Sequence, residues 1–135
     1  YLADLPGYGF AKAPKGVRGG FNRMIYDYIE FRENLVNVFL LIDSRHTPQA
    51  IDLQFMEWLG NKQIPFSIVF TKLDKLTSAQ MQKNLNHYKN ELLKKWEELP
   101  KIFVSSASSK VGKLEILGYI DSLNVHLVYE LKKKK

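Results

Sequence analysis

Three nearly continuous apolar runs, with helical patterns between them, constrain the fold of this chain more than any other feature. The runs cover Val36–Ile42, Pro65–Phe70 and Lys101–Ser105. They are rich in β-branched and aromatic residues and do not alternate with polar ones, so we predict strands that are buried on both faces, as in a parallel sheet. The apolar start of the chain, residues 1–3, predicts the end of a further strand.

Apolar residues at helical spacing predict helices between these strands, at residues 21–35, 51–59, 81–99 and 114–127. The third pattern is the clearest, with Thr77 or Ser78 as its N-cap and Pro100 at its end. The alternation of strands and helices predicts a three-layer α/β fold, a mostly parallel sheet with flanking helices and right-handed crossovers. Ligands bind such sheets at the carboxyl ends of the strands, which directs attention to the loops there.

Composition limits the class of protein. The 135 residues suit one domain, and the 45% of hydrophobic residues is enough for a core. The chain has no cysteine, which agrees with a reducing compartment, and we expect a cytoplasmic protein. No apolar run approaches the roughly 20 residues of a membrane span. Four of the +6 net charges belong to the tail Lys132–Lys135, so the rest of the chain is only mildly basic.

The loop after the second apolar run reads Thr71, Lys72, Leu73, Asp74. The Asp74 carboxylate can accept hydrogen bonds from N1–H and the 2-amino group of guanine, a donor pair that adenine lacks. The aliphatic stem of Lys72 can lie across a purine ring, and the Thr71 hydroxyl can tie the loop. The alternative is a solvated turn with helix caps.

The loop after the third run begins with Ser105, Ser106 and Ala107, whose backbone N–H groups can meet a carbonyl such as O6 of guanine. Alone it is more typical of a capping turn, but the predicted topology places it beside the Thr71–Asp74 loop. After the first run, Asp43–His46 favours a helix cap at Asp43 or Ser44, with Arg45 in a salt bridge, over a contact with a partner.

The turn near the start reads Asp4, Leu5, Pro6, Gly7. Asp4 can accept from a water held by Mg²⁺, and the N–H of Gly7 can meet a terminal phosphate because glycine allows a close approach of the backbone. The alternative is an ordinary Pro-Gly turn. The glycines that follow predict a mobile segment; they are Gly9, Gly16, Gly19 and Gly20.

In this order the three loops resemble those of the P-loop GTPase superfamily. The stretches DLPGYGFAK (residues 1–12 contain it), LIDSRH and TKLDKL more closely resemble the EngB/YihA family of bacterial ribosome-assembly GTPases. The resemblance covers residues 1–128 as part of a G domain and leaves 129–135 as a basic tail. It implies binding of GTP and GDP with Mg²⁺, through Asp4–Gly7, Thr71–Asp74 and Ser105–Ala107, with Asp4 reaching the metal through water.

The resemblance also implies a monomer that acts in assembly of the large ribosomal subunit and is linked to cell division and septation. The GxxxxGKS phosphate loop and the first switch are not in this sequence, so we expect it to be the C-terminal portion of a longer polypeptide. The rival interpretation is a non-catalytic RNA- or protein-binding α/β module that has lost nucleotide binding.

Tyr8 follows Gly7, beside the position of the attacking water, where many GTPases carry a glutamine. We therefore expect that GTP hydrolysis is slow. The alternative is that Tyr8 only packs against other side chains and has no role in hydrolysis. Basic residues follow the turn with two phenylalanines interleaved, and they suit either rRNA phosphates or a solvated loop. They are Lys12, Lys15, Arg18 and Arg23, with Phe10 and Phe21. The lysine tail predicts a disordered end or a further phosphate contact.

Overall fold

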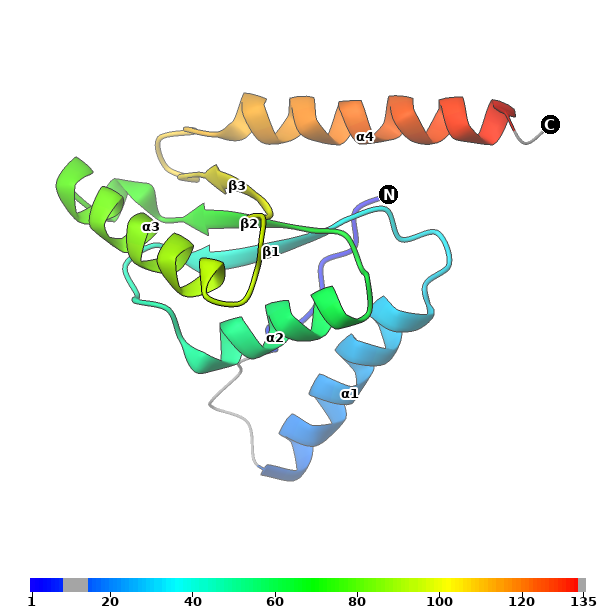
Figure 1. Cartoon of the computed structure of the whole chain (residues 1–135), viewed down its shortest axis with the longest axis horizontal. Helices are drawn as coiled ribbons and strands as arrows, with labels where there is room; N and C mark the ends of the chain where they lie inside the picture. The colour runs from blue at the N-terminus through cyan, green and yellow to red at the C-terminus, as the bar shows by residue number, and fades with distance from the viewer. Residues whose placement is uncertain (9–14, 134–135) are drawn as a thin grey trace.

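The computed structural model describes residues 1–8 and 15–133, which form a small parallel sheet flanked by helices (Figure 1). The elements, in chain order, are α1 (Lys15–Phe31), β1 (Val38–Asp43), α2 (Ala50–Asn61), β2 (Phe66–Thr71), the single 3₁₀ turn η1 (Leu73–Lys75), α3 (Ser78–Leu93), β3 (Lys101–Val104) and α4 (Lys113–Lys133).

The three predicted apolar runs are the three strands, and they pair in parallel in the order β1-β2-β3. The register places Val38 opposite Phe66 and Asp43 opposite Thr71, so β1 and β2 end level with each other. Ile68 of β2 lies opposite Ile102 of β3. Phe66–Phe70 of the central strand is buried along its whole length, which is why its sequence is apolar without alternation.

The two faces of the sheet are covered to different extents. One face packs on α1, α2 and α3 in a single apolar core, in which the Phe70 and Tyr88 rings meet at 5.0 Å. On the other face Phe39 and Phe103 contact Tyr119 of α4, the helix drawn apart from the rest in Figure 1. The predicted three-layer α/β architecture is therefore confirmed, although Leu41 on the α4 face is 64% exposed.

Several local predictions are wrong. Residues 1–7 form no strand, and none of the described strands pairs with them. Gly16, Gly19 and Gly20 lie within α1, so the predicted mobile segment is helical at these positions. The lysine tail is helical as far as it is described: α4 continues through Lys133, where basic side chains suit the negative end of the helix dipole.

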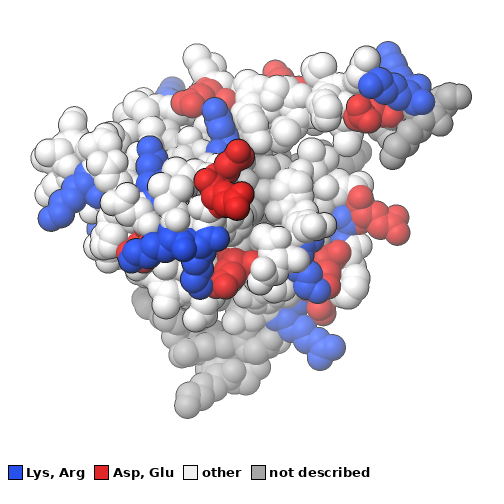
Figure 2. Space-filling model, in the orientation of Figure 1, with Lys and Arg blue, Asp and Glu red and all other residues white. Residues whose placement is uncertain are grey.

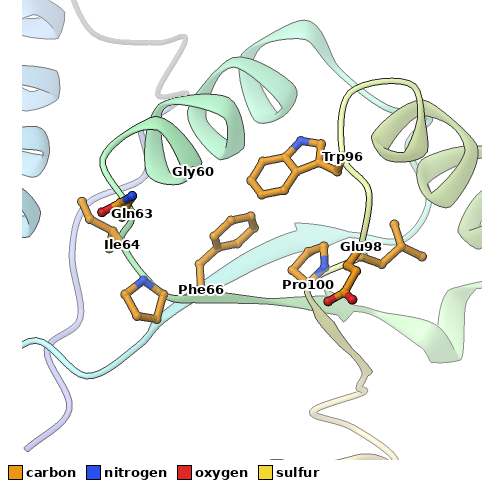
Figure 3. A pocket seen from close by; sticks show the side chains of 9 residues that line it. Gly60, Gln63, Ile64, Phe66, Trp96, Glu98 and Pro100 are labelled. Atoms are coloured by element: carbon orange, nitrogen blue, oxygen red, sulfur yellow. The ribbon is translucent and has the colours of Figure 1, made fainter.

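Helix α3 begins as predicted but ends early. Thr77 is its N-cap, and its hydroxyl and the Gln80 side chain form a capping box. The helix stops at Leu93 rather than before Pro100, and beyond it the partly buried Trp96 packs against the core. The Trp96 ring meets Phe66 at 5.6 Å and lies so close to Gly60 that a Cβ there would stand 2.5 Å from it. Trp96, Phe66 and Gly60 all line a shallow pocket at the amino ends of β2 and β3 (Figure 3).

No helix in the part of the chain that the structure describes is long and apolar enough to cross a membrane.

Candidate nucleotide-binding site

The loop after β2 is tied to its neighbours on both sides. The Thr71 hydroxyl donates to the Ile42 carbonyl at 3.2 Å, the tie predicted from its sequence position. Lys72 then adopts a left-handed conformation, with φ of 60°, and turns the chain into η1. The N–H of Leu73 donates to the Ser105 carbonyl at 3.1 Å, which joins this loop directly to the one after β3. The structure therefore brings the two predicted base-binding loops together.

The Asp74 side chain is held by the neighbouring loop. The hydroxyl of Ser106, a residue only 2% exposed, donates to Oδ1 of Asp74 at 2.6 Å. The Ser106 oxygen in turn lies 3.1 Å from the Ser108 hydroxyl and accepts from the Ser109 N–H at 3.2 Å. The hydrogen bond from Ser106 holds the pKa of Asp74 below its ordinary value, so this carboxylate is charged at neutral pH and can only accept hydrogen bonds.

The end of β3 is anchored to β2, which fixes the start of the serine loop. Both the N–H and the hydroxyl of Ser105 donate to the Phe70 carbonyl, at 2.7 Å and 3.3 Å. Ala107 follows the buried Ser106 and is exposed, as a backbone that meets a ligand would have to be.

Gly112 closes the serine loop, and the sequence motifs did not single it out. Its φ is +78°, and a Cβ at this position would stand 2.0 Å from the carbonyl oxygen of Val104. Only glycine fits such a close approach of two backbone segments at positive φ. The Ser106 contact of Ser108 was also missed, since one serine in a serine-rich turn carries no signal of its own.

Asp43, at the end of β1, is the centre of a cluster of charges. Its carboxylate accepts from Arg45 at 2.6 Å and 2.9 Å and from the Lys72 ammonium at 2.9 Å. The hydrogen bonds from Arg45, followed by the one from Lys72, hold the pKa of Asp43 well below its ordinary value. The predicted salt bridge of Arg45 is thus present, whereas its extension to Lys72 was not foreseen.

The predicted helix cap at Asp43 or Ser44 is wrong. Helix α2 begins only at Ala50, with Gln49 at the N-cap position and no side-chain cap. Three residues, Arg45 to Thr47, continue the loop before Pro48, so the Asp43 carboxylate stays at the strand end. Its oxygens bond the Arg45 backbone N–H and side chain instead.

The turn Asp4–Gly7 is placed very differently. Asp4, Pro6 and Gly7 are exposed, and no hydrogen bond joins them to the Thr71–Asp74 or Ser105–Ala107 loops among the described residues. Of the four residues in this turn, only Leu5 packs against the core. The turn is therefore attached to the core through Leu5, and its role in binding phosphate and metal stays a prediction.

Tyr8 anchors the end of this turn. Its ring stacks on Phe55 of α2, with centroids 4.4 Å apart and planes inclined by 9°. Its phenol donates to Oδ1 of Asp52 at 2.6 Å. Burial, followed by the hydrogen bond to Asp52, raises the pKa of the Tyr8 phenol well above its ordinary value. Tyr8 therefore packs against the core, which is one of the two roles that we considered from the sequence; the other was a role near the attacking water.

The predicted basic segment is only partly visible. Gly9, Phe10 and Lys12 lie outside the described residues, as do the side chains of Lys15, Arg18 and Phe21. Arg23 is exposed on α1 and pairs with Asp27 at 3.6 Å. Within the described residues no group of three or more His, Cys, Asp or Glu side chains could hold a metal ion.

Comparison with known sequences agrees with the resemblance. Proteins named "Probable GTP-binding protein EngB" match this chain at 53% identity over 94% of its length in Porphyromonas gingivalis, 54% over 92% in Phocaeicola vulgatus and 49% over 92% in Christiangramia forsetii. The chain spans only 61–63% of the length of these and similar curated relatives. No family model matches the chain.

Comparison with solved structures concerns the fold alone. The apo form of translation elongation factor SelB from Methanococcus maripaludis matches with a TM-score of 0.68 and 20% identity, over 91% of this chain and 25% of that one. Its likeness supports the α/β fold. Given the relatives at about 50% identity, the motifs at the strand ends and this fold, the chain belongs to the EngB family, as a portion of the length of its members.

Proposed function

We propose that this chain supplies the guanine-recognition half of a GTP-binding switch. The observation that carries the proposal is the charged Asp74 carboxylate, held by Ser106 and joined through Leu73 and Ser105 to the next loop. The name of the relatives, GTP-binding protein, points the same way. Thr71, Lys72, Leu73 and Asp74 bind the base from one side, and Ser105, Ser106 and Ala107 complete the pocket.

The selectivity follows from the protonation state of Asp74. A carboxylate that only accepts hydrogen bonds suits the N1–H and 2-amino donors of guanine, whereas adenine presents an acceptor at N1. With adenine the carboxylate would be desolvated without a matching donor, which costs more than the bond itself is worth. Lys72 adds its aliphatic stem, while Asp43 restrains its ammonium at the rim.

Phosphate and metal binding are assigned to the Asp4–Gly7 turn. The exposed Asp4 carboxylate suits a Mg²⁺ ion that keeps several waters and is held mainly by phosphate oxygens, a site that needs no cluster of protein carboxylates. Such an ion would neutralise charge on the phosphates. Leu5 and Pro6 shape the turn, and the Gly7 N–H donates to the terminal phosphate.

Hydrolysis of GTP to GDP and phosphate is expected to be slow in the full-length protein. Tyr8 has no amide with which to orient the attacking water, and its phenol is already bonded to Asp52. An ion or a partner would have to supply the missing group.

The cellular role that we propose is assembly of the large ribosomal subunit in the cytoplasm, with a link to cell division and septation, by a monomeric protein. It rests on the family resemblance. On the face shown in Figure 2 basic and acidic side chains are interspersed, so the mixed charge of this face does not favour a broad phosphate-binding surface there. Sedimentation of the full-length protein with large subunits, with GDP or a non-hydrolysable GTP analogue, tests the role. Nucleotide-dependent binding is expected, and identical binding with both nucleotides would contradict it.

Calorimetry on the full-length polypeptide tests the proposed function. GTP is expected to bind at least about 100-fold more tightly than ATP, because the wrong base leaves Asp74 unpaired. Asp74→Asn is expected to weaken GTP and to improve binding of xanthosine triphosphate, whose 2-oxo group suits an amide donor. Glu57→Gln, a surface change on α2, is the control. Equal affinities of the wild type for ATP and GTP would exclude the proposal.

A further inference from the structure

Tyr8 is held by more than its own stacking contact. Asp52, in the first turn of α2, accepts the Tyr8 hydroxyl at Oδ1 and the Tyr88 hydroxyl at Oδ2, at 2.6 Å and 3.1 Å. One carboxylate therefore joins the residue after Gly7 to α3. Its two oxygens serve two phenols that lie far apart in the sequence.

The Tyr88 side of this cluster belongs to the hydrophobic core. Tyr88 is fully buried, and its ring meets Phe70 edge to face at 5.0 Å, one residue before Thr71. Phe55, on which Tyr8 stacks, is 2% exposed. The cluster is thus fixed to α2, α3 and the end of β2, whereas most of the Asp4–Gly7 turn that precedes Tyr8 is exposed.

The chemistry of the three groups fits a firm attachment. A phenol that donates to a carboxylate forms a charge-assisted hydrogen bond, which is about twice as strong as a neutral one. Burial raises the pKa of both phenols, and the negative charge of Asp52 adds to the effect, so both hydroxyls remain protonated donors at neutral pH.

We propose that Asp52 and Tyr88 are positioning residues for the Asp4–Gly7 turn: by latching Tyr8 between α2 and α3, they set where the Gly7 N–H stands when a terminal phosphate binds. This inference rests on the proposed function and concerns the same site. Gly7 precedes Tyr8 directly, so a fixed Tyr8 limits the positions that the Gly7 backbone can reach. A turn that is already ordered loses less conformational freedom on binding, which favours the ligand that contacts it.

The latch distinguishes two ligands of the same pocket. GDP lacks the terminal phosphate that the turn would contact, so loosening the turn leaves its affinity unchanged. A non-hydrolysable GTP analogue contacts the turn. Because it must order a loosened turn on binding, its affinity falls. A residue that merely stabilised the fold would change both affinities together, or neither.

The test uses the full-length protein and calorimetry with GDP and with the GTP analogue. Tyr8→Phe keeps the ring on Phe55 and removes only the hydroxyl, and Asp52→Ala removes the shared acceptor. Each is expected to weaken the analogue about 10-fold, as for loss of a hydrogen bond to a charged group, and to leave GDP within about 2-fold. Tyr88→Phe removes only the longer bond and is expected to have a smaller effect.

Two further variants sharpen the test. The double variant Tyr8→Phe with Asp52→Ala is expected to lose no more analogue affinity than Asp52→Ala alone, because both changes break one interaction. Asp52→Asn, which keeps an oxygen acceptor, is expected to recover part of the loss. Thermal unfolding of each variant establishes that it is folded, and Tyr8→Phe is the least disruptive of them.

An unchanged ratio of analogue affinity to GDP affinity in Tyr8→Phe and Asp52→Ala would overturn the latch, and so would a tighter analogue. In either case a wild type that still prefers GTP to ATP keeps the proposed function. A wild type without guanine preference would end the proposed function and the latch together.

Discussion

Two parts of the candidate site contrast in how they are built. The base side, made of the loops after β2 and β3, is fixed by hydrogen bonds from Thr71 to Ile42, Leu73 to Ser105 and Ser106 to Asp74. The phosphate side, Asp4–Gly7, is exposed, and among the described residues it is held by packing of Leu5 and by its neighbour Tyr8.

The contrast concerns how firmly each part of the proposed site is held before a ligand binds. Adjacent parallel strands end at one edge of the sheet, so the loops that follow β2 and β3 are brought together by the same hydrogen bonds that form the sheet. The loops that we propose to bind the base are therefore already held together without a ligand. The phosphate turn has one anchoring side chain at its end, which suits a segment whose position depends on what is bound.

The largest effect is expected from Gly112→Ala, which attacks the base side at its closest backbone contact. The new Cβ would meet the Val104 carbonyl at 2.0 Å, at a φ of +78°. We expect a loss of about 2–4 kcal/mol in unfolding free energy, measured by urea denaturation, and weaker GDP binding.

Gly118→Ala is its matched control. Gly118 lies in α4, and apart from its chain neighbours and the backbone of its own helix no described atom lies within 4 Å of the place that a Cβ would take, so we expect a gain of up to about 1 kcal/mol from helix propensity. Equal effects of the two changes would mean that the Gly112 contact does not constrain the loop.

An intermediate effect is expected from Ser106→Ala. The change removes the 2.6 Å donor to Asp74, so the carboxylate is no longer held for the base. GDP and GTP affinities are expected to fall together by about 10-fold, as for loss of one bond to a charged group. Ser122→Ala, on the exposed surface of α4, is the control. A fall in GTP affinity alone would contradict the separation of the two sides.

The smallest effect is expected from Asp43→Asn, which removes the charge that restrains Lys72. Since the folded pKa of Asp43 is depressed, its charge stabilises the fold above the ordinary value of 3.8, and this contribution is lost as pH falls below it. Its partners are about half exposed, so we expect only about 0.5–1 kcal/mol at neutral pH.

The wild type and Asp43→Asn are therefore compared by urea denaturation at neutral pH and at progressively lower pH. Their difference should shrink in acid. A difference that stays constant from neutral pH down to strong acid would show that the carboxylate charge contributes nothing.

The sequence predicted the strands, the three layers and the base loops because these depend on local patterns: apolar runs, helical spacing and short motifs. It failed where contacts join distant residues. Asp43 and Lys72 are 29 positions apart, and Tyr8 and Asp52 are 44 apart, so no spacing links them. The glycines of α1 suggested mobility because local propensity was weighed without the packing of Ile25 and Ile29 into the core.

Hydrogen exchange of backbone amides in the full-length protein tests the contrast between the two sides most directly. Without nucleotide, the amides of Leu73 and Ser105 should exchange slowly, and that of Gly7 fast. GDP should slow exchange in residues 71–76 and 105–112 and leave residues 4–7 unchanged, whereas a non-hydrolysable GTP analogue should slow both regions. Equal protection of both regions by GDP, or of neither by the analogue, would contradict the account.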